Sequence, residues 1–259
     1  MFYKDLDYRV ERIKPFRIFG NLYFAGSYFG LTHLIDTGKG LIVIDTGIRQ
    51  TLFMLIDSVR MLGFDPGDIK YIVQSHGHFD HTGGTRALQQ LYGAKVFIGR
   101  DDAPMVMRQA DDLAAAFGYP ATEPFAPDVL LDDKSVIELG NTRIECVHTP
   151  GHSPGVMSLF FNVSDGSRTF RAGMVGGIGT GPMLGDDKAA VRQRYYACLE
   201  QLKSEHVDIH LGNHLFDNDT LRKRDELPSN ADAFIDPSGR EWLAFLDRCA
   251  QKLKADAGE

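Results

Sequence analysis

Three histidines and one aspartate lie within six residues of the chain, at His76, His78, Asp80 and His81. His76 and His78 are two residues apart, so on an extended segment both side chains project to the same side. Asp80 and His81 follow just past the end of the expected strand, where the chain must turn. Imidazole and carboxylate ligands without a thiolate favour zinc, with manganese or iron as substitutes. The pattern predicts a metal centre. The alternative, a polar loop that caps nearby helices, fits a single histidine better.

The segment that contains this cluster resembles the signature of the metallo-β-lactamase superfamily. It reads QSHGHFDHTGG over residues 74–84, and a second matching segment, HTPGHSPG, covers residues 148–155. Earlier, the segment IVIDTG at residues 42–47 is similar to the family's strand that ends in an Asp-x-Gly turn. The resemblance implies that His76, His78 and His152 hold a first zinc ion. Three neutral nitrogen ligands leave a fourth position open, as in catalytic zinc sites.

The second metal position depends on which branch of the family the chain resembles. Glyoxalase II-like thioesterases, quorum-signal lactonases and RNA-processing nucleases bridge two metals with an aspartate after the next hairpin. The corresponding segment here, RAGMVGG at residues 171–177, has neither a carboxylate nor a cysteine. Subclass B3 β-lactamases are more similar, because their second zinc uses the aspartate and last histidine of the cluster and a distant histidine. This resemblance, which extends to PFRIFGNLY at residues 15–23, assigns Asp80, His81 and His214 to a second zinc ion.

Three further side chains compete with these ligands. His210 is the alternative to His214, but the alternating apolar residues of the expected strand 207–211 place it on the opposite face. His214 lies in the loop beyond that strand, where the family's ligand would be. His148 is expected only to line the pocket, and Cys146 to be a small buried hydrophobe.

The resemblance implies a hydrolase with two zinc ions per chain. A metal-bound hydroxide would open a lactam, lactone or related small amide or ester bond, and B3-like β-lactamase activity falls within this expectation. Asp80 would be the catalytic residue that orients the nucleophile. Where B3 enzymes usually have a substrate-positioning Asp-Ser pair, this chain has Gly173-Met174, which leaves the substrate unassigned. A glyoxalase II-like thioesterase is the alternative. A non-hydrolytic dioxygenase or a non-catalytic binding module fits the complete ligand set less well.

Aromatic residues accompany the expected pocket. They lie in the first hairpin region and in the segment 103–127, at Tyr28, Phe29, His33, Phe117, Tyr119 and Phe125. If they line the pocket, they favour an uncharged, partly apolar substrate. If they are core aromatics beneath a loop, they carry no information about the substrate.

Short strands and amphipathic helices must position these residues. Apolar runs predict strands at 16–19, 22–25, 31–35, 41–44, 69–73 and 96–98, and again at 136–139, 142–147, 156–163, 169–172 and 207–211. Helical spacing predicts helices at 51–62, 83–92, 191–202 and 235–253, with a helix and a long loop over 103–127. No low-complexity linker divides the chain, so we expect one domain over residues 1–259. Strands with helices outside both faces predict an α/β fold. The resemblance implies an αββα sandwich of two mixed β-sheets flanked by helices.

Composition and charge limit the partners and the location. The chain has 259 residues, 43% hydrophobic and 24% charged, as in ordinary globular proteins. Its net charge of -7 and scattered basic residues argue against a nucleic-acid substrate, and the mixed-sign patch at 222–226 is expected to be a surface turn. We expect a small-molecule substrate, no nucleic acid and no membrane, with the oligomeric state left open. Three widely spaced cysteines, no recognisable signal peptide and no run of about 18 apolar residues favour the cytoplasm, or the periplasm if a leader has been removed.

Overall fold

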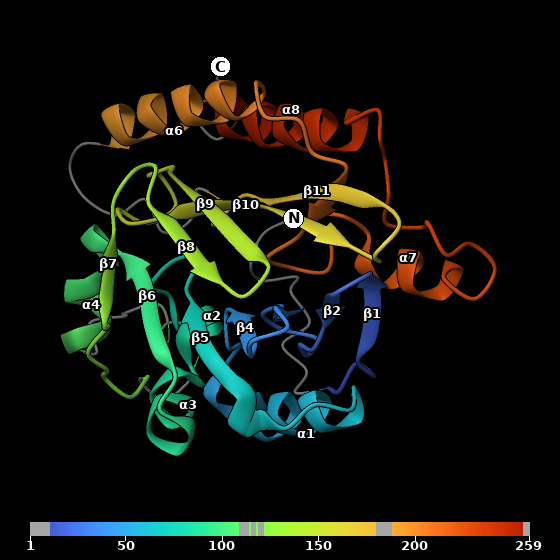
Figure 1. Cartoon of the computed structure of the whole chain (residues 1–259). Helices are drawn as coiled ribbons and strands as arrows, with labels where there is room; N and C mark the ends of the chain where they lie inside the picture. Colours follow the sequence, from blue (N-terminus) through green and yellow to red (C-terminus); the bar gives the residue numbers. More distant parts are fainter. Residues whose placement is uncertain (1–10, 109–113, 115–117, 119–121, 180–187, 256–259) are drawn as a thin grey trace.

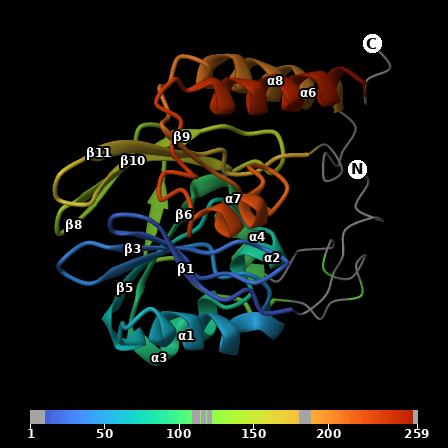
Figure 2. The ribbon, with the colours of Figure 1, turned by 90° about the vertical axis from the view of Figure 1, so that its right-hand side faces the viewer.

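Two β-sheets pack face to face, and helices cover the outer face of each sheet (Figures 1 and 2). The computed structural model describes residues 11–108, 114, 118, 122–179 and 188–255. In Figure 2 the layers follow one another from a helical layer through two sheets to a second helical layer. None of the helices within the described ranges is long and apolar enough to cross a membrane.

The first sheet joins an antiparallel half to a parallel half. Its seven strands lie in the order β1 (Phe16–Phe19), β2 (Leu22–Phe24), β3 (His33–Asp36), β4 (Leu41–Ile44), β5 (Ile69–Val73), β6 (Lys95–Gly99) and β7 (Val129–Leu131). Neighbouring strands from β1 to β4 pair antiparallel, whereas those from β4 to β7 pair parallel through longer crossovers. The carboxyl ends of β4 and β5 therefore lie at the same edge of the sheet.

The second sheet is also mixed. Its five strands lie in the order β12 (Ile209–Leu211), β11 (Thr169–Met174), β10 (Met157–Ser164), β9 (Thr142–His148) and β8 (Val136–Leu139). β8 to β11 pair antiparallel in sequence order, and β12 pairs parallel with β11. The turn between β9 and β10 carries the second matching segment of the sequence, residues 148–155.

Four helices form the outer layers (Figure 1). α1 (Leu52–Met61) and α3 (Thr85–Tyr92) pack on the first sheet, and α6 (Lys188–Leu202) and α8 (Arg240–Ala255) pack on the second. Each pair buries its apolar side chains in a cluster with the sheet beneath it. Shorter helices occupy the connections: α2 (Phe79–Thr82), α4 (Ala103–Arg108), α7 (Thr220–Glu226), η2 (Arg49–Thr51), η3 (Pro66–Asp68) and η4 (Arg100–Asp102).

The apolar core between the sheets draws on both of them. Ile42 and Ile44 of β4 belong to one cluster with Leu159 and Phe161 of β10, and all four side chains are at most 1% exposed. Removing this apolar surface from water is the main force that holds the two sheets together.

The arrangement confirms the predicted fold class, and all eleven predicted strands are present with ends shifted by at most two residues. The helix predicted for 83–92 begins only at Thr85, because Gly83 is the C-cap of a preceding short helix and Gly84 is the N-cap residue of α3. The preceding residues form the separate helix α2. In the predicted helix and loop over 103–127, α4 accounts for the helix, and most of residues 109–121 lie outside the described residues.

Three further expectations were wrong. The terminal helix begins at Arg240 rather than at residue 235, since Gly239 has a φ of 64° and interrupts the helix there. The patch at 222–226 is part of α7 rather than a turn, with Arg222 and Glu226 paired one helical turn apart at 2.6 Å. β7 was not predicted, because it is short and two of its three side chains are exposed, so it lacks a clear apolar pattern.

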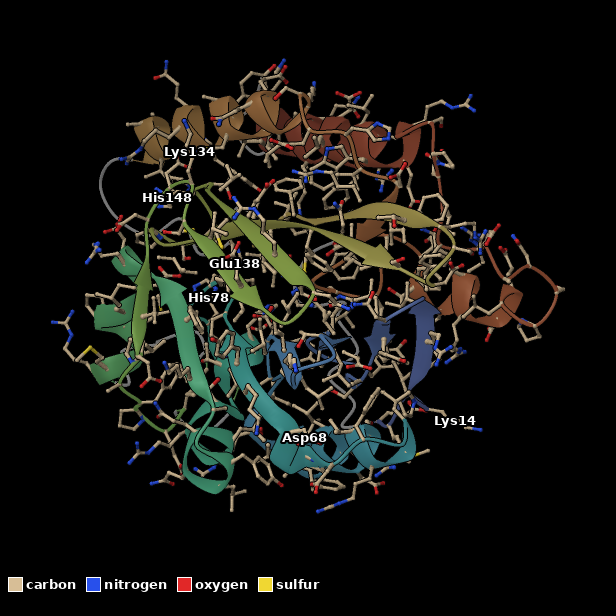
Figure 3. All side chains as sticks on the ribbon, viewed as in Figure 1. Lys14, Asp68, His78, Lys134, Glu138 and His148 are labelled. Atoms are coloured by element: carbon tan, nitrogen blue, oxygen red, sulfur yellow. The ribbon has the colours of Figure 1, made fainter. Side chains whose placement is uncertain are left out.

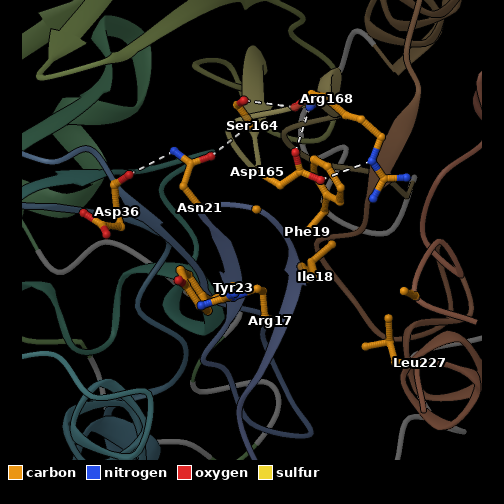
Figure 4. A pocket seen from close by; sticks show the side chains of 12 residues that line it. Arg17, Ile18, Phe19, Asn21, Tyr23, Asp36, Ser164, Asp165, Arg168 and Leu227 are labelled. Carbon is orange, nitrogen blue, oxygen red and sulfur yellow. Dashed lines mark hydrogen bonds and ion pairs between the residues drawn. The ribbon is translucent and has the colours of Figure 1, made fainter.

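A surface pocket of about 500 Å³ lies where hairpins of the two sheets meet (Figure 4). Asn21, in the β1–β2 turn, donates to the carbonyl oxygen of Asp36 at 2.9 Å and accepts from the backbone nitrogen of Ser164 at 3.0 Å. Arg168 pairs with Asp165 across 3.1 Å in the same wall. Asn21 thus joins the first sheet to the β10–β11 hairpin, and none of the predicted metal ligands lines this pocket.

Two glycines allow the end of β6 to approach the β9–β10 turn closely. A Cβ on Gly99 would overlap the carbonyl oxygen of Gly155, and a Cβ on Gly155 would overlap the backbone nitrogen of Asp102. Because both neighbours are backbone atoms, neither can move aside by changing a rotamer. The two sheets can meet at this point only where both positions lack side chains.

We expect Gly99→Ala to destabilise the protein by roughly 1–3 kcal/mol or more, because overpacking would push the β9–β10 turn away from β6. Urea unfolding of the variant measures this loss. The control is Gln90→Ala at an exposed position of α3, which should change stability by less than about 0.5 kcal/mol. Equal stability of the two variants would contradict the tight contact.

Candidate metal centre

All six predicted ligands lie in one buried region, where the ends of β4 and β5, the β9–β10 turn and the segment after β12 meet. Five of them are at most 7% exposed, and the side chain of His214 is 11% exposed. Figure 3 labels His78, close to α2, and His148, at the end of β9. One detail differs from expectation. β5 ends at Val73, so His76 and His78 lie in the irregular segment after the strand, and Asp80 and His81 lie in α2.

His76, His78 and His152 form the first compact donor group. One ligand atom of each lies within 4.8 Å of the others, and their ring centroids are 4.7 or 4.8 Å apart in every pair. His78 Nδ1 faces His152 Nε2 at 3.1 Å. Three imidazole nitrogens that converge in this way match the donor set of a catalytic zinc ion.

Backbone carbonyl groups set the tautomers of two of these histidines. His76 Nδ1 lies 2.8 Å from the oxygen of Gly176, and His152 Nδ1 lies 3.2 Å from the oxygen of Gly179. Since a carbonyl oxygen can only accept, each Nδ1 carries the proton and each Nε2 presents a lone pair. Within the described part of the chain, His76 Nε2 is buried without a hydrogen-bond partner. A buried lone pair of this kind fits a cation ligand.

His76, Asp80 and His81 form a second donor group within the same 4.8 Å limit. His81 Nε2 lies 3.4 Å from Asp80 Oδ2, and His214 Nε2 lies 3.7 Å from the same oxygen. The ring centroids of His81 and His214 are 5.3 Å apart. The structure therefore brings His214 to Asp80 and His81, as predicted, although metal binding by these residues stays a prediction.

The competing side chains have other partners. His210 is buried with its ring centroid 4.3 Å from that of Phe245, and its Nδ1 lies 3.5 Å from Glu241. His148 Nε2 lies 2.8 Å from the carbonyl oxygen of Pro154. Cys146 is fully buried in the core between the sheets, where burial raises its pKa to about 12. None of the three belongs to the two donor groups.

The segment after β11 contacts the donor groups through its backbone. A Cβ on Gly176 would overlap the carbonyl oxygen of Met157, and a Cβ on Gly177 would lie 2.8 Å from His152 Cδ2. A carboxylate therefore does not fit at either position with the present backbone. These two glycines therefore contribute backbone and no side chain to the site, and Gly176 supplies a carbonyl oxygen to His76.

Asp45 holds His81 in place, a role that the sequence analysis did not assign. Its carboxylate accepts hydrogen bonds from His81 Nδ1 at 2.8 Å, from Ser75 Oγ at 2.6 Å and from the backbone nitrogen of Ser75 at 2.7 Å. Asp45 has a φ of 58°, which is uncommon for a residue other than glycine. Its place directly after β4, in the matching segment 42–47, is the sequence signal that could have identified it.

Asp102 joins the two turns that carry the first donor group, and no sequence pattern indicated it. The carboxylate is fully buried and accepts from the backbone nitrogen of Gly77 at 2.8 Å, from Ser153 Oγ at 2.6 Å and from the backbone nitrogen of Gly155 at 2.7 Å. Gly77 lies inside the histidine cluster, and Ser153 and Gly155 lie in the β9–β10 turn. One carboxylate therefore fixes the separation of the two turns.

The segment that carries His214 is fixed by its neighbours. The carboxylate of Asp217 accepts from the backbone nitrogens of Asn213 and His214, each at 3.0 Å. Asn213 Nδ2 in turn lies 3.3 Å from the oxygen of Gly176 and 3.3 Å from Ser75 Oγ. These contacts tie the end of the second sheet to the segment after β5.

One of the expected aromatic residues reaches the site. The ring centroid of Phe29 lies 6.1 Å from that of His214 and 6.2 Å from that of Phe79. Three others belong to the packed layers, namely Tyr28, His33 and Phe125. Phe117 and Tyr119 lie outside the described residues.

Burial sets the protonation of the first donor group and of His214. It lowers the pKa of His76 and His78 well below the ordinary value of 6.5, and neighbouring imidazoles lower it further. It lowers the pKa of His152 and His214 to about 4. These four imidazoles are therefore neutral near pH 7, the form in which histidine binds metals.

For His81 and Asp80, neighbouring opposite charges outweigh burial and decide the pKa. Burial alone would lower the pKa of His81, but the carboxylates of Asp80 and Asp45 outweigh it and raise this pKa to about 10. Burial opposes the charge of Asp80, but His81 outweighs it and holds the pKa of Asp80 below its ordinary value. In the metal-free protein, His81 is thus an imidazolium between two carboxylates.

Comparisons with known proteins agree with this geometry. The sequence profile of the metallo-beta-lactamase superfamily matches residues 25–165. Among solved structures, the subclass B3 metallo-beta-lactamase of Bradyrhizobium japonicum has a TM-score of 0.86 with this chain at 27% identity. That similarity covers 96% of this chain and 95% of the other.

Similarity to curated relatives is more local. The hydroxyacylglutathione hydrolase GloC of Haemophilus influenzae is 26% identical over 145 residues, which cover 56% of this chain and 66% of that protein. The N-acyl homoserine lactonase AttM of Rhizobium radiobacter is 33% identical over 110 residues, which cover 40% of each protein. The chain thus spans between 40% and 66% of the length of these two relatives.

We expect Asp102→Asn to weaken metal retention and to destabilise the protein by about 1–3 kcal/mol, because the amide nitrogen would face the backbone N–H of Gly77 or Gly155, which can only donate. Zinc per chain after dialysis and urea unfolding measure the two effects. Asp101→Asn is the matched control, since its side chain is 57% exposed. If both variants kept zinc and stability alike, Asp102 would not join the two turns.

We expect the metal-free protein to lose stability as the pH falls from 6.5 towards 4. The unfolded chain then binds protons at His152 and His214, whose pKa in the folded protein is about 4. The loss is on the order of 1 kcal/mol per pH unit for each histidine. His81 does not offset it, because the stabilisation from its raised pKa is complete below 6.5 and is lost only as the pH rises through about 10.

Urea unfolding in chelator across this pH range tests the expectation. His152→Gln should reduce the pH dependence, whereas His206→Gln should leave it unchanged because His206 is 60% exposed. A stability that stays constant from pH 6.5 to 4 would show that these imidazoles are not buried in their neutral form.

Proposed function

Because the chain belongs to the metallo-beta-lactamase superfamily, we propose that it is a binuclear zinc hydrolase that opens a lactam, lactone or related small amide or ester bond. The observation that carries this proposal is the convergence of six candidate ligands, from three separate segments of the chain, in one buried place. The structural similarity to a subclass B3 metallo-beta-lactamase supports it, and B3-like β-lactamase activity is included.

The donor atoms suit two zinc ions per chain. We assign His76, His78 and His152 to one ion, and Asp80, His81 and His214 to the other. When bound, zinc lowers the pKa of water and polarises a carbonyl oxygen. His81 must give up the proton that Asp80 and Asp45 stabilise before its Nε2 can act as a ligand, so metal uptake is accompanied by proton release.

Asp80 is the catalytic carboxylate in this proposal. Its lowered pKa keeps it ionised, so it accepts a hydrogen bond from the attacking water and orients a lone pair of that water towards the substrate carbonyl. Asp45 keeps His81 turned towards Asp80. The carbonyl groups of Gly176 and Gly179 keep His76 and His152 in the tautomers that present Nε2. The leaving nitrogen or oxygen takes up a proton when its bond to the carbonyl carbon breaks.

A glyoxalase II-like thioesterase is the second candidate. The similarity to the hydroxyacylglutathione hydrolase of Haemophilus influenzae favours it. The lack of a carboxylate in residues 171–177, and of space for one at Gly177, favours the B3-like assignment instead. A non-hydrolytic dioxygenase has less support, because all six predicted ligands are present and lie close together.

We propose a small-molecule substrate and no nucleic-acid partner, in keeping with the net charge of -7 and the scattered basic residues. We also propose that residues 1–259 form one domain, since the two sheets share one apolar cluster.

The test is hydrolysis by zinc-loaded protein of a chromogenic cephalosporin, an N-acyl homoserine lactone and a hydroxyacylglutathione thioester. For one of them we expect a kcat/KM of roughly 10⁴ M⁻¹s⁻¹ or more. His152→Ala should lower this value at least about 100-fold and reduce bound zinc, because it removes a ligand of the first ion. His148→Ala, four residues earlier in the same turn region, should retain both.

Each alternative has its own outcome. Hydrolysis of the thioester alone would favour the second candidate. Full activity and zinc in His152→Ala would refute the ligand assignment, and turnover of none of the three substrate classes would refute the proposed hydrolase.

A further inference from the structure

An exposed aromatic ring lies beside His214. Phe216 is 49% exposed, and its ring is parallel to that of His214, with centroids 5.5 Å apart and an interplanar angle of 2°. Phe29, which also lies near His214, and Phe79, which lies near Phe29, are 3% and 4% exposed. Phe216 is therefore the phenylalanine of this group that still offers a face to solvent.

We propose that Phe216 is the platform on which an aromatic group of the substrate stacks, so that the enzyme selects small amides, esters or lactones that carry such a group. This inference rests on the proposed hydrolase function. It concerns a residue that belongs to neither donor group, and it assigns a substrate class to the surface next to His214.

The backbone on both sides of Phe216 is fixed before any ligand arrives. Asp217 accepts from the backbone nitrogen of His214 at 3.0 Å, and the backbone nitrogen of Asp217 donates to the oxygen of His214 at 3.1 Å. The backbone nitrogen of Thr220 donates to the oxygen of Leu215 at 3.1 Å, and the side chain of Leu215 packs against the core between the sheets. Leu215 thus anchors the turn while Phe216 stays at the surface. A rigid support lowers the entropy lost when a ligand binds.

A simpler function for Phe216 is to shield His214 from water. Single exposed apolar residues are common on protein surfaces, so exposure alone would not distinguish a shield from a platform. The two differ in what they recognise. A shield would affect metal retention and every substrate alike, whereas a platform discriminates between substrates that differ only by an aromatic ring. Stacking of this kind changes affinity by about 3- to 10-fold.

The experiment uses two matched pairs of substrates with zinc-loaded protein. Phenylacetyl-homoserine lactone is compared with acetyl-homoserine lactone, and benzylpenicillin with 6-aminopenicillanic acid. In the pair that the wild type hydrolyses, we expect the aromatic member to be preferred in kcat/KM by about 3- to 10-fold or more. Phe216→Ala should abolish this preference mainly through KM, and Phe216→Tyr should restore it.

The matched control is Phe53→Ala, since Phe53 is a phenylalanine of α1 that is 60% exposed. It should keep the wild-type preference and the wild-type zinc content. A Phe216→Ala variant that keeps the preference would overturn the platform. So would one that loses zinc and slows both members of a pair equally, because Phe216 would then be a shield.

A binding measurement distinguishes a failure of this inference from a failure of the proposed function. If the wild type hydrolyses neither pair, the hydrolase proposal fails for these bonds, and calorimetry with phenylacetate and acetate decides the inference. Tighter binding of phenylacetate that is lost in Phe216→Ala would support the platform. Equal binding of the two carboxylates by the wild type would overturn it.

Discussion

Buried carboxyl groups connect the segments that carry the candidate ligands, and each of them accepts several hydrogen bonds in place of its contacts with water. Asp45 links the end of β4 to the segment after β5, and Asp102 links that segment to the β9–β10 turn. Asp217 fixes the segment after β12. The ligands come from distant parts of the chain, yet their separations are fixed. Loss of one acceptor would leave buried N–H groups without hydrogen-bond partners, and this would lower the stability of the fold.

The two donor groups meet opposite electrostatic requirements within a few ångströms. The first contains neutral imidazoles, two of which are held in one tautomer by the carbonyl groups of Gly176 and Gly179. In the second, the proton on His81 balances the charges of Asp80 and Asp45 in the metal-free protein. A bound cation would provide this balance in its place. The site is therefore ordered through its hydrogen bonds before a metal binds, and metal binding exchanges one positive charge for another.

The αββα fold and the grouping of the six candidate ligands could be predicted from local patterns together with the family resemblance. His76 to His81 are contiguous, and the period of two in β12 separates His210 from the site. Asp102 could not be found in this way, since its partners Gly77 and Ser153 are 25 and 51 residues distant along the chain. Phe216 could not be found from local patterns either, because its place beside His214 depends on the turn that Asp217 closes. Contacts made by the finished fold decide both positions, and no short sequence pattern records them.

The glycines after β11 have a consequence for how this chain can evolve. A ligand side chain at Gly176 or Gly177 has no room with the present backbone, because even a Cβ there meets Met157 or His152. A single substitution would therefore damage the existing ligand geometry before it could supply a new ligand. The backbone would have to shift first, through changes elsewhere that bring no benefit of their own. Such epistasis would keep Gly176 and Gly177 free of side-chain ligands during evolution.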